Sequence, residues 1–261
     1  MTLDTSTREQ LAIALAEAHR NATPIDRLSA THDLTIDDAY DIQSRVLERR
    51  VAGGARQVGH KIGLTSAGIQ QQLGVDEPDF GRILDDMMVE GSTIDASGLI
   101  QPRIEPELAL RLASPLEPPV SRLDVVGATA EVFPVLEVID SRIADWDIGI
   151  EDTIADNASS ALVVVGDRVT TADTIDPLLE SVVLRKNGQL VDHGVGAAVM
   201  GNPFDAVAWL ANTIDRYDQS LAAGDIVLSG SMTPAADIGP GDVVAATFAS
   251  LGTVTVRVDP A

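Results

Sequence analysis

A change of periodicity along the chain constrains the fold more than any other feature. Apolar residues recur at helical spacing in segments 5–21 and 35–51. Further along, short runs alternate between apolar and polar residues and are separated by turn residues, as in half-buried strands. Because helices concentrate at the front and strands in the body, the sequence predicts an α+β protein and not a regular βαβ alternation. We expect residues 1–80 to form a small N-terminal α/β part and residues 81–261 a strand-rich body, which can count together as one domain.

The same patterns predict individual elements. Thr5 or Ser6 can cap the first helix, and Thr35 with Asp38 resembles a capping box that opens the second. The dipeptide Asn-Gly at 187–188 lies between two alternating runs, which predicts a β-hairpin. Further helices or helical turns are predicted at 66–73, 123–131, 153–160 and 203–217. Further strands are predicted at 57–64, 90–97, 107–112, 134–140, 161–165, 225–229, 242–248 and 252–258.

The chain is strongly acidic, and this limits its partners. It has 40 acidic residues, 28 of them Asp, against 18 basic ones, which gives a net charge of −22. A chain of this charge repels phosphate backbones, so nucleic-acid binding is not expected. The acidic residues could simply keep the protein soluble. The excess of Asp and the presence of only two Lys favour a halophilic protein, whose self-repulsion is screened in a high-salt cytoplasm.

The apolar segments and the lack of cysteine exclude further classes. No apolar run approaches the roughly 18–20 residues that span a bilayer, and the polar N-terminus lacks the apolar segment of a signal peptide. The absence of cysteine excludes disulfides, cysteine nucleophiles and thiolate-bound metals. We therefore expect a cytoplasmic protein that does not bind membranes.

Three glutamates are candidate metal ligands. Glu105 and Glu107 lie two residues apart in QPRIEPELAL, so in a strand both side chains point to the same face. Glu137 interrupts the otherwise apolar run PVLEVID, where a buried carboxylate is costly unless it is paired or bound to a metal. Three carboxylates without Cys or His nearby would suit Mg²⁺ or Mn²⁺. The alternative is that Glu105 and Glu107 face solvent and that Glu137 pairs with Arg103 or Arg142.

Two further charged residues precede the glutamates. Lys61 in GHKIGLTS is flanked by glycines and a β-branched residue, and a partly buried lysine can transfer a proton or stabilise an oxyanion. Its alternative role is an ordinary ion pair with one of the many carboxylates. Asp79 lies in DEPDFG between Pro78 and Gly81, a loop in which Asp commonly caps a turn. The local pattern by itself favours that structural role.

The remaining motifs are less specific. Asn157, Ser159 and Ser160 in ADNASS could form local hydrogen bonds or line a pocket. His60 is expected to be structural, because neighbours on a strand point to opposite faces. The sequence contains no G-x-S-x-G nucleophile elbow, P-loop or G-x-G-x-x-G phosphate-binding loop.

Several segments together resemble one family. The sequence is similar to the hydratase/decarboxylase branch of the fumarylacetoacetate hydrolase superfamily, which includes 2-keto-4-pentenoate hydratases and 4-oxalocrotonate decarboxylases. The matching stretches follow the family's order and span nearly the whole chain. They are GHKIGLTS at 59–66, QQLGVDEPDFG at 71–81, QPRIEPELAL at 101–110, PVLEVIDSRIADW at 134–146, DTIADNASS at 152–160 and GNPFDAVAWLAN at 201–212.

The resemblance implies a metal-dependent active site. The family's metal-binding glutamates fall on Glu105, Glu107 and Glu137, with Mg²⁺ or Mn²⁺ as the expected ion. Its active-site lysine falls on Lys61 and the acidic partner of that lysine on Asp79. These two residues would move protons during the reaction.

The resemblance also implies substrate contacts and a fold. Leu73 matches a position whose backbone approaches the bound oxo acid, and Ser159 matches a substrate-contacting position, with Ser160 as the alternative register. The family fold is a mixed α/β chain whose larger part is a β-roll around the metal. Pro106, between two metal-binding glutamates, departs from the family's pattern. Because Pro has no N–H, we expect its strand at a sheet edge or pocket rim.

The activity implied by the resemblance is hydration of 2-hydroxypenta-2,4-dienoate to 4-hydroxy-2-oxopentanoate, in the catabolism of aromatic compounds. The alternative is decarboxylation of 4-oxalocrotonate, whose second carboxylate would need a cation, and Arg82 is the nearest candidate. C–C hydrolysis, another reaction of 2-oxo acids, or a non-catalytic partner subunit are the remaining alternatives. We expect a small 2-oxo acid as the ligand, a homo-oligomer as the assembly, and association with a neighbouring pathway enzyme.

Overall fold

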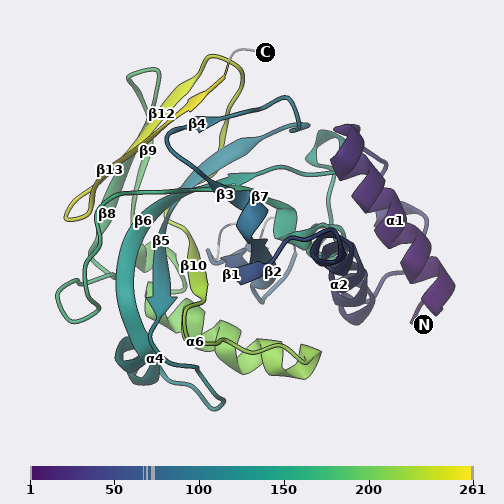
Figure 1. The fold of residues 1–261 in the computed structure, drawn as a ribbon, viewed down its shortest axis with the longest axis horizontal. Coiled ribbons are helices and arrows are strands. Elements are labelled where there is room, and N and C mark those ends of the chain that lie inside the picture. Colours follow the sequence, from purple (N-terminus) through teal and green to yellow (C-terminus); the bar gives the residue numbers. More distant parts are fainter. Residues whose placement is uncertain (1, 67, 69, 72–73, 260–261) are drawn as a thin grey trace.

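Two helices flank a body of curved β-structure. The structure, a computed structural model, describes residues 2–66, 68, 70–71 and 74–259. Helices α1 (Thr5–Asn21) and α2 (Ile36–Ala52) lie together on one side of the molecule, on the right in Figure 1. Two sheets form the rest, with α6 (Pro203–Ile214) below them in this view. The predicted α+β class, with helices at the front and strands in the body, is confirmed.

Local sequence explains how the two N-terminal helices begin. The Asp4 carboxylate accepts a hydrogen bond from the N–H three residues on, at 2.8 Å, and caps α1. The prediction of Thr5 or Ser6 as the cap is therefore wrong, because Thr5 already belongs to the helix. In α2, Thr35 and Asp38 form the predicted capping box, in which each side chain accepts the backbone N–H of the other.

The larger sheet has eight strands and contains the segments with the candidate ligands. Its strand order is β2-β1-β10-β5-β6-β7-β3, and β11 pairs with β5. The two longest strands, β5 and β6, curve together through the centre of this order (Figure 1). The bounds are β1 Gln57–Gly63, β2 Asp79–Leu84, β3 Met88–Val89, β5 Arg103–Leu112, β6 Thr129–Ile139, β7 Ser160–Val165, β10 Ile226–Ser231 and β11 Ala236–Asp237.

The smaller sheet has five strands and lies on the outer side of the body, at the upper left of Figure 1. Its order is β4-β13-β12-β8-β9, and the predicted hairpin is confirmed as the β8–β9 pair. Asn187 and Gly188 have φ of 54° and 78°, which these residue types tolerate in a tight turn. The bounds are β4 Thr93–Ile94, β8 Ser181–Lys186, β9 Gln189–Val195, β12 Val243–Phe248 and β13 Gly252–Val258.

Three predicted elements are shorter than expected. Of the strand predicted at 90–97, only Thr93 and Ile94 pair, because they meet β13 at its last residues. The helix predicted at 153–160 is α5 (Ile150–Ala155) followed by a single turn at Asn157–Ser159. The helix predicted at 123–131 is α4 (Arg122–Ala128), after which the chain enters β6.

Pro106 does not lie on an edge strand, because β5 pairs with β6 on one side and with β10 and β11 on the other. The sheet-edge half of the prediction is therefore wrong, and the alternative of a pocket rim stays a prediction. The Pro106 carbonyl accepts a hydrogen bond from the Met232 N–H at 3.0 Å. In a strand, the N–H and C=O of one residue point to the same side. The side of Pro106 on which another residue would carry an N–H therefore faces the break between β10 and β11. Regular strand pairing is interrupted there, so the sheet loses no hydrogen bond.

One hydrophobic cluster connects the helices to both sheets. It includes Leu11 and Ile42 from the helices, Leu108 from β5 and Val244 from β12, all buried. The division into residues 1–80 and 81–261 stays a prediction. Among the helices that the described residues form, none is both long and apolar enough to cross a membrane.

Candidate active site

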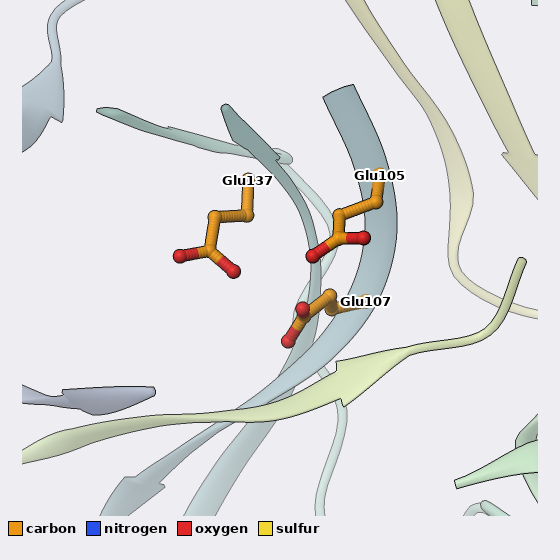
Figure 2. Close-up of side chains that lie close together, drawn as sticks. All are labelled: Glu105, Glu107 and Glu137. Atoms are coloured by element: carbon orange, nitrogen blue, oxygen red, sulfur yellow. The ribbon is translucent and has the colours of Figure 1, made fainter. Parts of the chain in front are cut away.

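Strand pairing brings the three glutamates together. Glu105 on β5 lies directly opposite Glu137 on β6, and Glu107 lies on the same face of β5 two residues further on. One carboxylate oxygen from each lies within 4.8 Å of the others. Figure 2 shows the three side chains pointing into one space. The predicted same-face arrangement of Glu105 and Glu107 is therefore present. Glu107 is fully buried and Glu105 partly buried, so the alternative in which both face solvent does not hold.

The arginines considered as alternative partners of Glu137 pair elsewhere. Arg103 contacts Asp237 at 2.9 Å, and Arg142 contacts Asp156 at 2.5 Å. The ion pair that Glu137 does form is with Lys61. The cluster therefore has one neighbouring cation for three carboxylates.

The burial of this cluster leaves acceptors without donors. Glu107 and Glu137 are fully buried and Glu105 is partly buried. The Gly230 N–H donates to Glu107 at 2.7 Å and the Ser160 hydroxyl donates to Glu137 at 2.6 Å, but the second oxygen of each glutamate has no hydrogen bond. Burial, followed by repulsion from Glu137, raises the pKa of Glu105 to about 7 and raises that of Glu107 well above its ordinary value.

Lys61 lies beside the cluster on β1. Its Nζ is 3.4 Å from Oε2 of Glu137 and donates to the Ala158 carbonyl at 3.0 Å. Burial alone would lower the pKa of Lys61, but the surrounding carboxylates, Glu137 first, outweigh burial and raise it. The side chain is thus a charged donor, held between a backbone carbonyl and a carboxylate.

Asp79 begins β2 and lies opposite Gly63 in the β1–β2 pair. A Cβ on Gly63 would come within 2.2 Å of the Asp79 carboxylate and 3.4 Å of the Lys61 Nζ, so only glycine leaves room for this pair. One Asp79 oxygen is buried without a hydrogen bond. Burial raises the pKa of Asp79 to about 6, although the Lys61 ammonium opposes the shift. A carboxyl with this pKa can both accept and return a proton near neutral pH.

A strained turn lies beside Lys61. Asn157, Ala158 and Ser159 have φ of 58°, 49° and 54°, a left-handed conformation that Asn tolerates but that costs roughly 1–2 kcal/mol for Ala and for Ser. The turn aims the Ala158 carbonyl at Lys61 and delivers the Ser160 hydroxyl to Glu137. The Ser159 hydroxyl instead lies 3.4 Å from that of Thr153. The predicted substrate contact at Leu73 lies outside the described residues.

A comparison with family models bears directly on this site. Residues 76–259, which include Asp79 and all three glutamates, match the model described as fumarylacetoacetate (FAA) hydrolase C-terminal. The chain belongs to the fumarylacetoacetate hydrolase family. The resemblance drawn from the motifs is thereby confirmed, and the two curled sheets are the family's fold.

Relatives in this family cover almost the whole chain. The 2-keto-4-pentenoate hydratase of Paraburkholderia xenovorans (strain LB400) is 44% identical over 251 residues, 95% of this chain and 93% of the relative. The 2-hydroxyhexa-2,4-dienoate hydratase of Comamonas testosteroni is 42% identical over 248 residues, 93% of this chain and 94% of the relative. The structure of 4-oxalocrotonate decarboxylase from Pseudomonas putida G7, complexed with magnesium and adipate, has a TM-score of 0.95 at 35% identity and covers 98% of this chain and 99% of its own.

Parts of this family member's site could not be found by searching for reactive side chains. Gly63 and Gly230 contribute through a missing Cβ and a backbone N–H. A Cβ on Gly230 would meet the Thr65 side chain at 2.4 Å, and its φ of 110° also favours glycine. The sequence signal for Gly63 is only its place two residues after Lys61, and Gly230 has no candidate site residue near it in the sequence. For the predicted substrate contact, Ser160 is the alternative to Ser159, because the two adjacent serines differ in the sequence only by one position.

Proposed function

We propose that this protein is a metal-dependent hydratase that adds water to 2-hydroxypenta-2,4-dienoate and forms 4-hydroxy-2-oxopentanoate, in the catabolism of ring-cleavage products of aromatic compounds. The observation that carries the proposal is the buried cluster of Glu105, Glu107 and Glu137 beside Lys61 and Asp79. It lies in a chain that is 44% identical to a protein named as a 2-keto-4-pentenoate hydratase. Two structures of the similar decarboxylase, one with magnesium and one with calcium, support a divalent ion.

The cluster fits a hard divalent cation, and we propose Mg²⁺ or Mn²⁺. Glu107 has a buried oxygen without a hydrogen bond, and the matching oxygen of Glu137 has only the ion pair with Lys61 at 3.4 Å. Burial holds the pKa of Glu105 and Glu107 above the ordinary value. Such acceptors are stabilised by a cation and suit ions that prefer oxygen ligands. When bound there, the ion would polarise the 2-oxo group and stabilise enolate charge.

Lys61 and Asp79 would handle the protons. Tautomerisation of the dienol moves a proton from the C2 hydroxyl to C5, and hydration then places hydroxide on C4 and a proton on C3. Asp79, with a pKa of about 6, is suited to accept and return these protons. Lys61 stays protonated, so it would donate a hydrogen bond to oxygen atoms that gain negative charge. We propose that Ser160 orients Glu137 and that Leu73 and Ser159 line the substrate site.

The charges around the site favour hydration over the decarboxylation of 4-oxalocrotonate. A second substrate carboxylate would need a cation of its own, but Arg82 donates to Ser44 on α2, on the face of β2 opposite Asp79. Among the described residues, Lys61 is the one cation that forms an ion pair with the cluster. The sequence from Leu64 to Val75 carries no charge. An uncharged substrate tail therefore suits the site better.

The proposal is tested by product identification. The protein is incubated separately with 2-hydroxypenta-2,4-dienoate and with 4-oxalocrotonate, with Mg²⁺ or Mn²⁺ and again with excess chelator, and products are followed by NMR. We expect 4-hydroxy-2-oxopentanoate from the first substrate in the presence of metal. Carbon dioxide from the second substrate at a higher kcat/KM would establish the decarboxylase instead. No turnover of either would favour a non-catalytic subunit. A homo-oligomer, also proposed, is tested by mass measurement in solution.

A further inference from the structure

The turn at 157–159 contacts the site, and residues outside the turn help to hold its conformation. Its carbonyl at Ala158 accepts from Lys61, and the following residue, Ser160, donates to Glu137. No glycine relieves the three left-handed residues. Two backbone hydrogen bonds within the turn, from the Ser159 N–H to the Asp156 carbonyl and from the Ser160 N–H to the Asn157 carbonyl, are supplemented by contacts from outside. On the β2 side, the Asn157 side chain accepts from the N–H of residue 82 at 2.8 Å and donates to its carbonyl at 3.0 Å.

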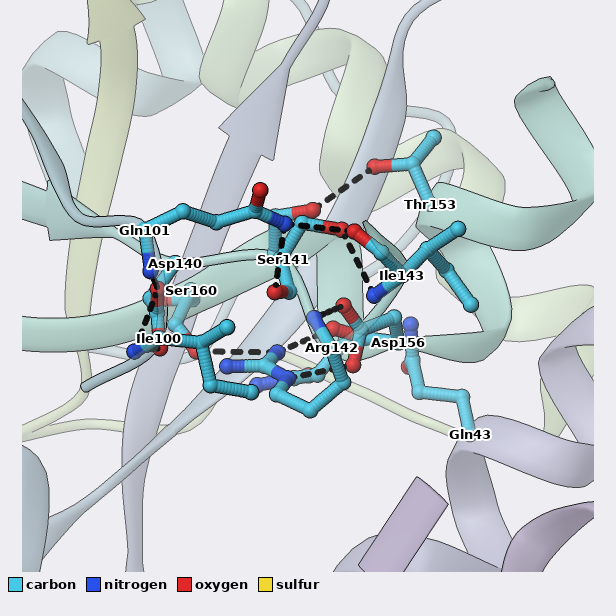
Figure 3. A network of polar contacts seen from close by, with 12 residues as sticks. Gln43, Ile100, Gln101, Asp140, Ser141, Arg142, Ile143, Thr153, Asp156 and Ser160 are labelled. Atoms are coloured by element: carbon cyan, nitrogen blue, oxygen red, sulfur yellow. Dashed lines mark hydrogen bonds and ion pairs between the residues drawn. The ribbon is translucent and has the colours of Figure 1, made fainter. Parts of the chain in front are cut away.

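On the other side, Arg142 contacts both ends of the turn (Figure 3). Its Nε donates to the Asp156 carboxylate at 2.5 Å, and its Nη2 donates to the Asp156 carbonyl at 2.7 Å and to the Ser160 carbonyl at 3.5 Å. Its backbone N–H donates to the second Asp156 carboxylate oxygen at 2.9 Å. Both side chains are buried, with 5% and 3% exposure. One planar guanidinium with several fixed donors makes all these side-chain contacts at once.

The segment that carries this arginine continues directly from the strand of Glu137. Asp140, three residues after Glu137, donates its N–H to the Ser159 carbonyl at 2.8 Å. Its carboxylate accepts from the backbone N–H groups of residues 100–101. Glu137, Asp140 and Arg142 therefore belong to one continuous stretch, which holds the turn on the side away from β2. Movement of the turn would shift the acceptor of Lys61 and the donor of Glu137 together.

We propose that Arg142, paired with Asp156, is a positioning residue for the hydration site: it fixes residues 156 and 160, and thereby holds the Ala158 carbonyl against Lys61 and the Ser160 hydroxyl against Glu137. The inference rests on the proposed function for its kinetic readout only. A partner that orients a metal ligand from outside the coordination sphere commonly contributes about 10–100-fold in metal affinity or activity. We expect an effect of that size from Arg142.

The test uses two variants. Arg142→Lys keeps the charge opposite Asp156, but a single ammonium cannot reach the Asp156 carboxylate, the Asp156 carbonyl and the Ser160 carbonyl together. Arg142→Ala removes the guanidinium. The substitution also enlarges a cavity of about 550 Å³ between α1, α2 and β7 that Arg142 already lines. The enlarged cavity leaves room for an added guanidinium ion. For each variant, kcat, KM, the Kd for Mn²⁺ and the melting temperature are measured. The measurements on Arg142→Ala are repeated with millimolar methylguanidinium and, separately, with ethylammonium.

We expect Arg142→Lys to fold, with kcat and Mn²⁺ affinity each lower by about 10–100-fold. Methylguanidinium should restore activity to Arg142→Ala and ethylammonium should not, whereas Lys61→Ala should not respond to methylguanidinium. Glu180→Gln is the matched control: among the described residues this buried carboxylate accepts side-chain and backbone hydrogen bonds from Ser250 alone, so the substitution should affect stability and not the site.

Two results would overturn the inference. One is an Arg142→Lys protein whose kcat and Mn²⁺ affinity stay within about twofold of the parent, well below the 10–100-fold effect expected of an orienting partner. The other is a loss of kcat in Arg142→Lys that merely parallels a loss of folded protein, as in Glu180→Gln. If the parent protein does not hydrate the dienoate, the proposed function fails, and the Mn²⁺ affinity of the two variants still decides the role of Arg142.

Discussion

The carboxylates on the inner face of β5 and β6 and those on the molecular surface have opposite electrostatic environments. At the inner site, burial raises the pKa of Glu105 to about 7 and that of Asp79 to about 6. On the surface, hydrogen bonds from neighbouring backbone and side-chain donors lower the pKa of many carboxylates. Examples are Asp4, Asp85, Asp95 and Asp124.

Strand β6 shows the same contrast within seven residues. Glu131 is 41% exposed and pairs with Arg111 at 2.9 Å, as surface carboxylates commonly do. Glu137 is fully buried and retains an oxygen without a hydrogen bond. In a chain with 40 acidic residues, acidity itself therefore does not identify the site. The site is identified by the burial of several carboxylates beside a single ammonium, because burying these charges costs folding free energy unless a further cation binds them.

The largest effect is expected at Asp79. Asp79→Asn keeps the shape of the side chain but removes the proton acceptor, so kcat should fall by about 10²–10⁴, the range for a general acid–base residue. The matched surface change is Asp85→Asn, directly after the same strand, where the carboxylate pairs with Arg56. Steady-state kinetics should show activity close to that of the parent for Asp85→Asn. Comparable kcat values for the two variants would remove the distinction between the inner and surface carboxylates.

A slightly smaller effect is expected at Lys61. Lys61→Ala should lower kcat by about 10²–10³, the scale observed when one oxyanion-stabilising donor is removed. Because Lys61 and Asp79 are proposed to act as a unit, the double variant should be little worse than the more damaged single variant. Calorimetry should still detect metal binding to each variant. A near-normal kcat in both metal-bound single variants would place proton transfer on other residues.

The glutamates should differ from this pair by their effect on metal affinity. Glu137→Gln should weaken Mg²⁺ binding by about tenfold or more, because loss of a charged ligand costs more than the roughly 1.4 kcal/mol that a tenfold change represents. Glu131→Gln, on the same strand but at the surface, should bind Mg²⁺ as the parent does. Equal affinities of the two variants in calorimetry would contradict the three-glutamate site.

The sequence predicted features that depend on local periodicity and composition. The same-face pair Glu105 and Glu107 follows from the two-residue repeat of a strand, and the capping box and hairpin follow from their turn residues. The partner of Lys61 at Ala158 could not be predicted, because it is a backbone carbonyl in a left-handed turn without glycine. The location of Pro106 also depends on tertiary structure, since the neighbouring strand is interrupted there.

The choice between two adjacent serines has the same cause. Ser159 and Ser160 are equivalent in the sequence, and only the sharp turn between α5 and β7 gives them different neighbours. The family resemblance implies a substrate contact in this segment, and which of the two serines makes it stays a prediction. Long-range contacts such as that between Arg142 and Ser160 likewise left no periodic pattern to recognise.

The smallest and most distributed effect is expected from the surface carboxylates. Even if every basic residue were paired, 22 negative charges would remain, which is the net charge of the chain. Their mutual repulsion is screened when the Debye length falls from about 10 Å at 0.1 M salt to about 3 Å at 1 M. Salt also weakens exposed ion pairs, but these contribute only about 0–1 kcal/mol each. The melting temperature should therefore rise from low salt to molar KCl, by roughly 2–4 °C for each kcal/mol of repulsion removed.

The variant that isolates this effect is a triple substitution at the surface, Asp26→Asn, Asp145→Asn and Asp167→Asn, which removes three exposed carboxylates outside the site. It should melt at a higher temperature than the parent in low salt and respond less to KCl, because less repulsion remains to be screened. Dissolved salt screens the repulsion between buried carboxylates less than that between exposed ones. We therefore expect bound Mg²⁺, and not KCl, to neutralise the inner carboxylates. A melting temperature that is flat or falls with KCl would leave solubility as the role of the surface acids, and the halophilic interpretation would be wrong.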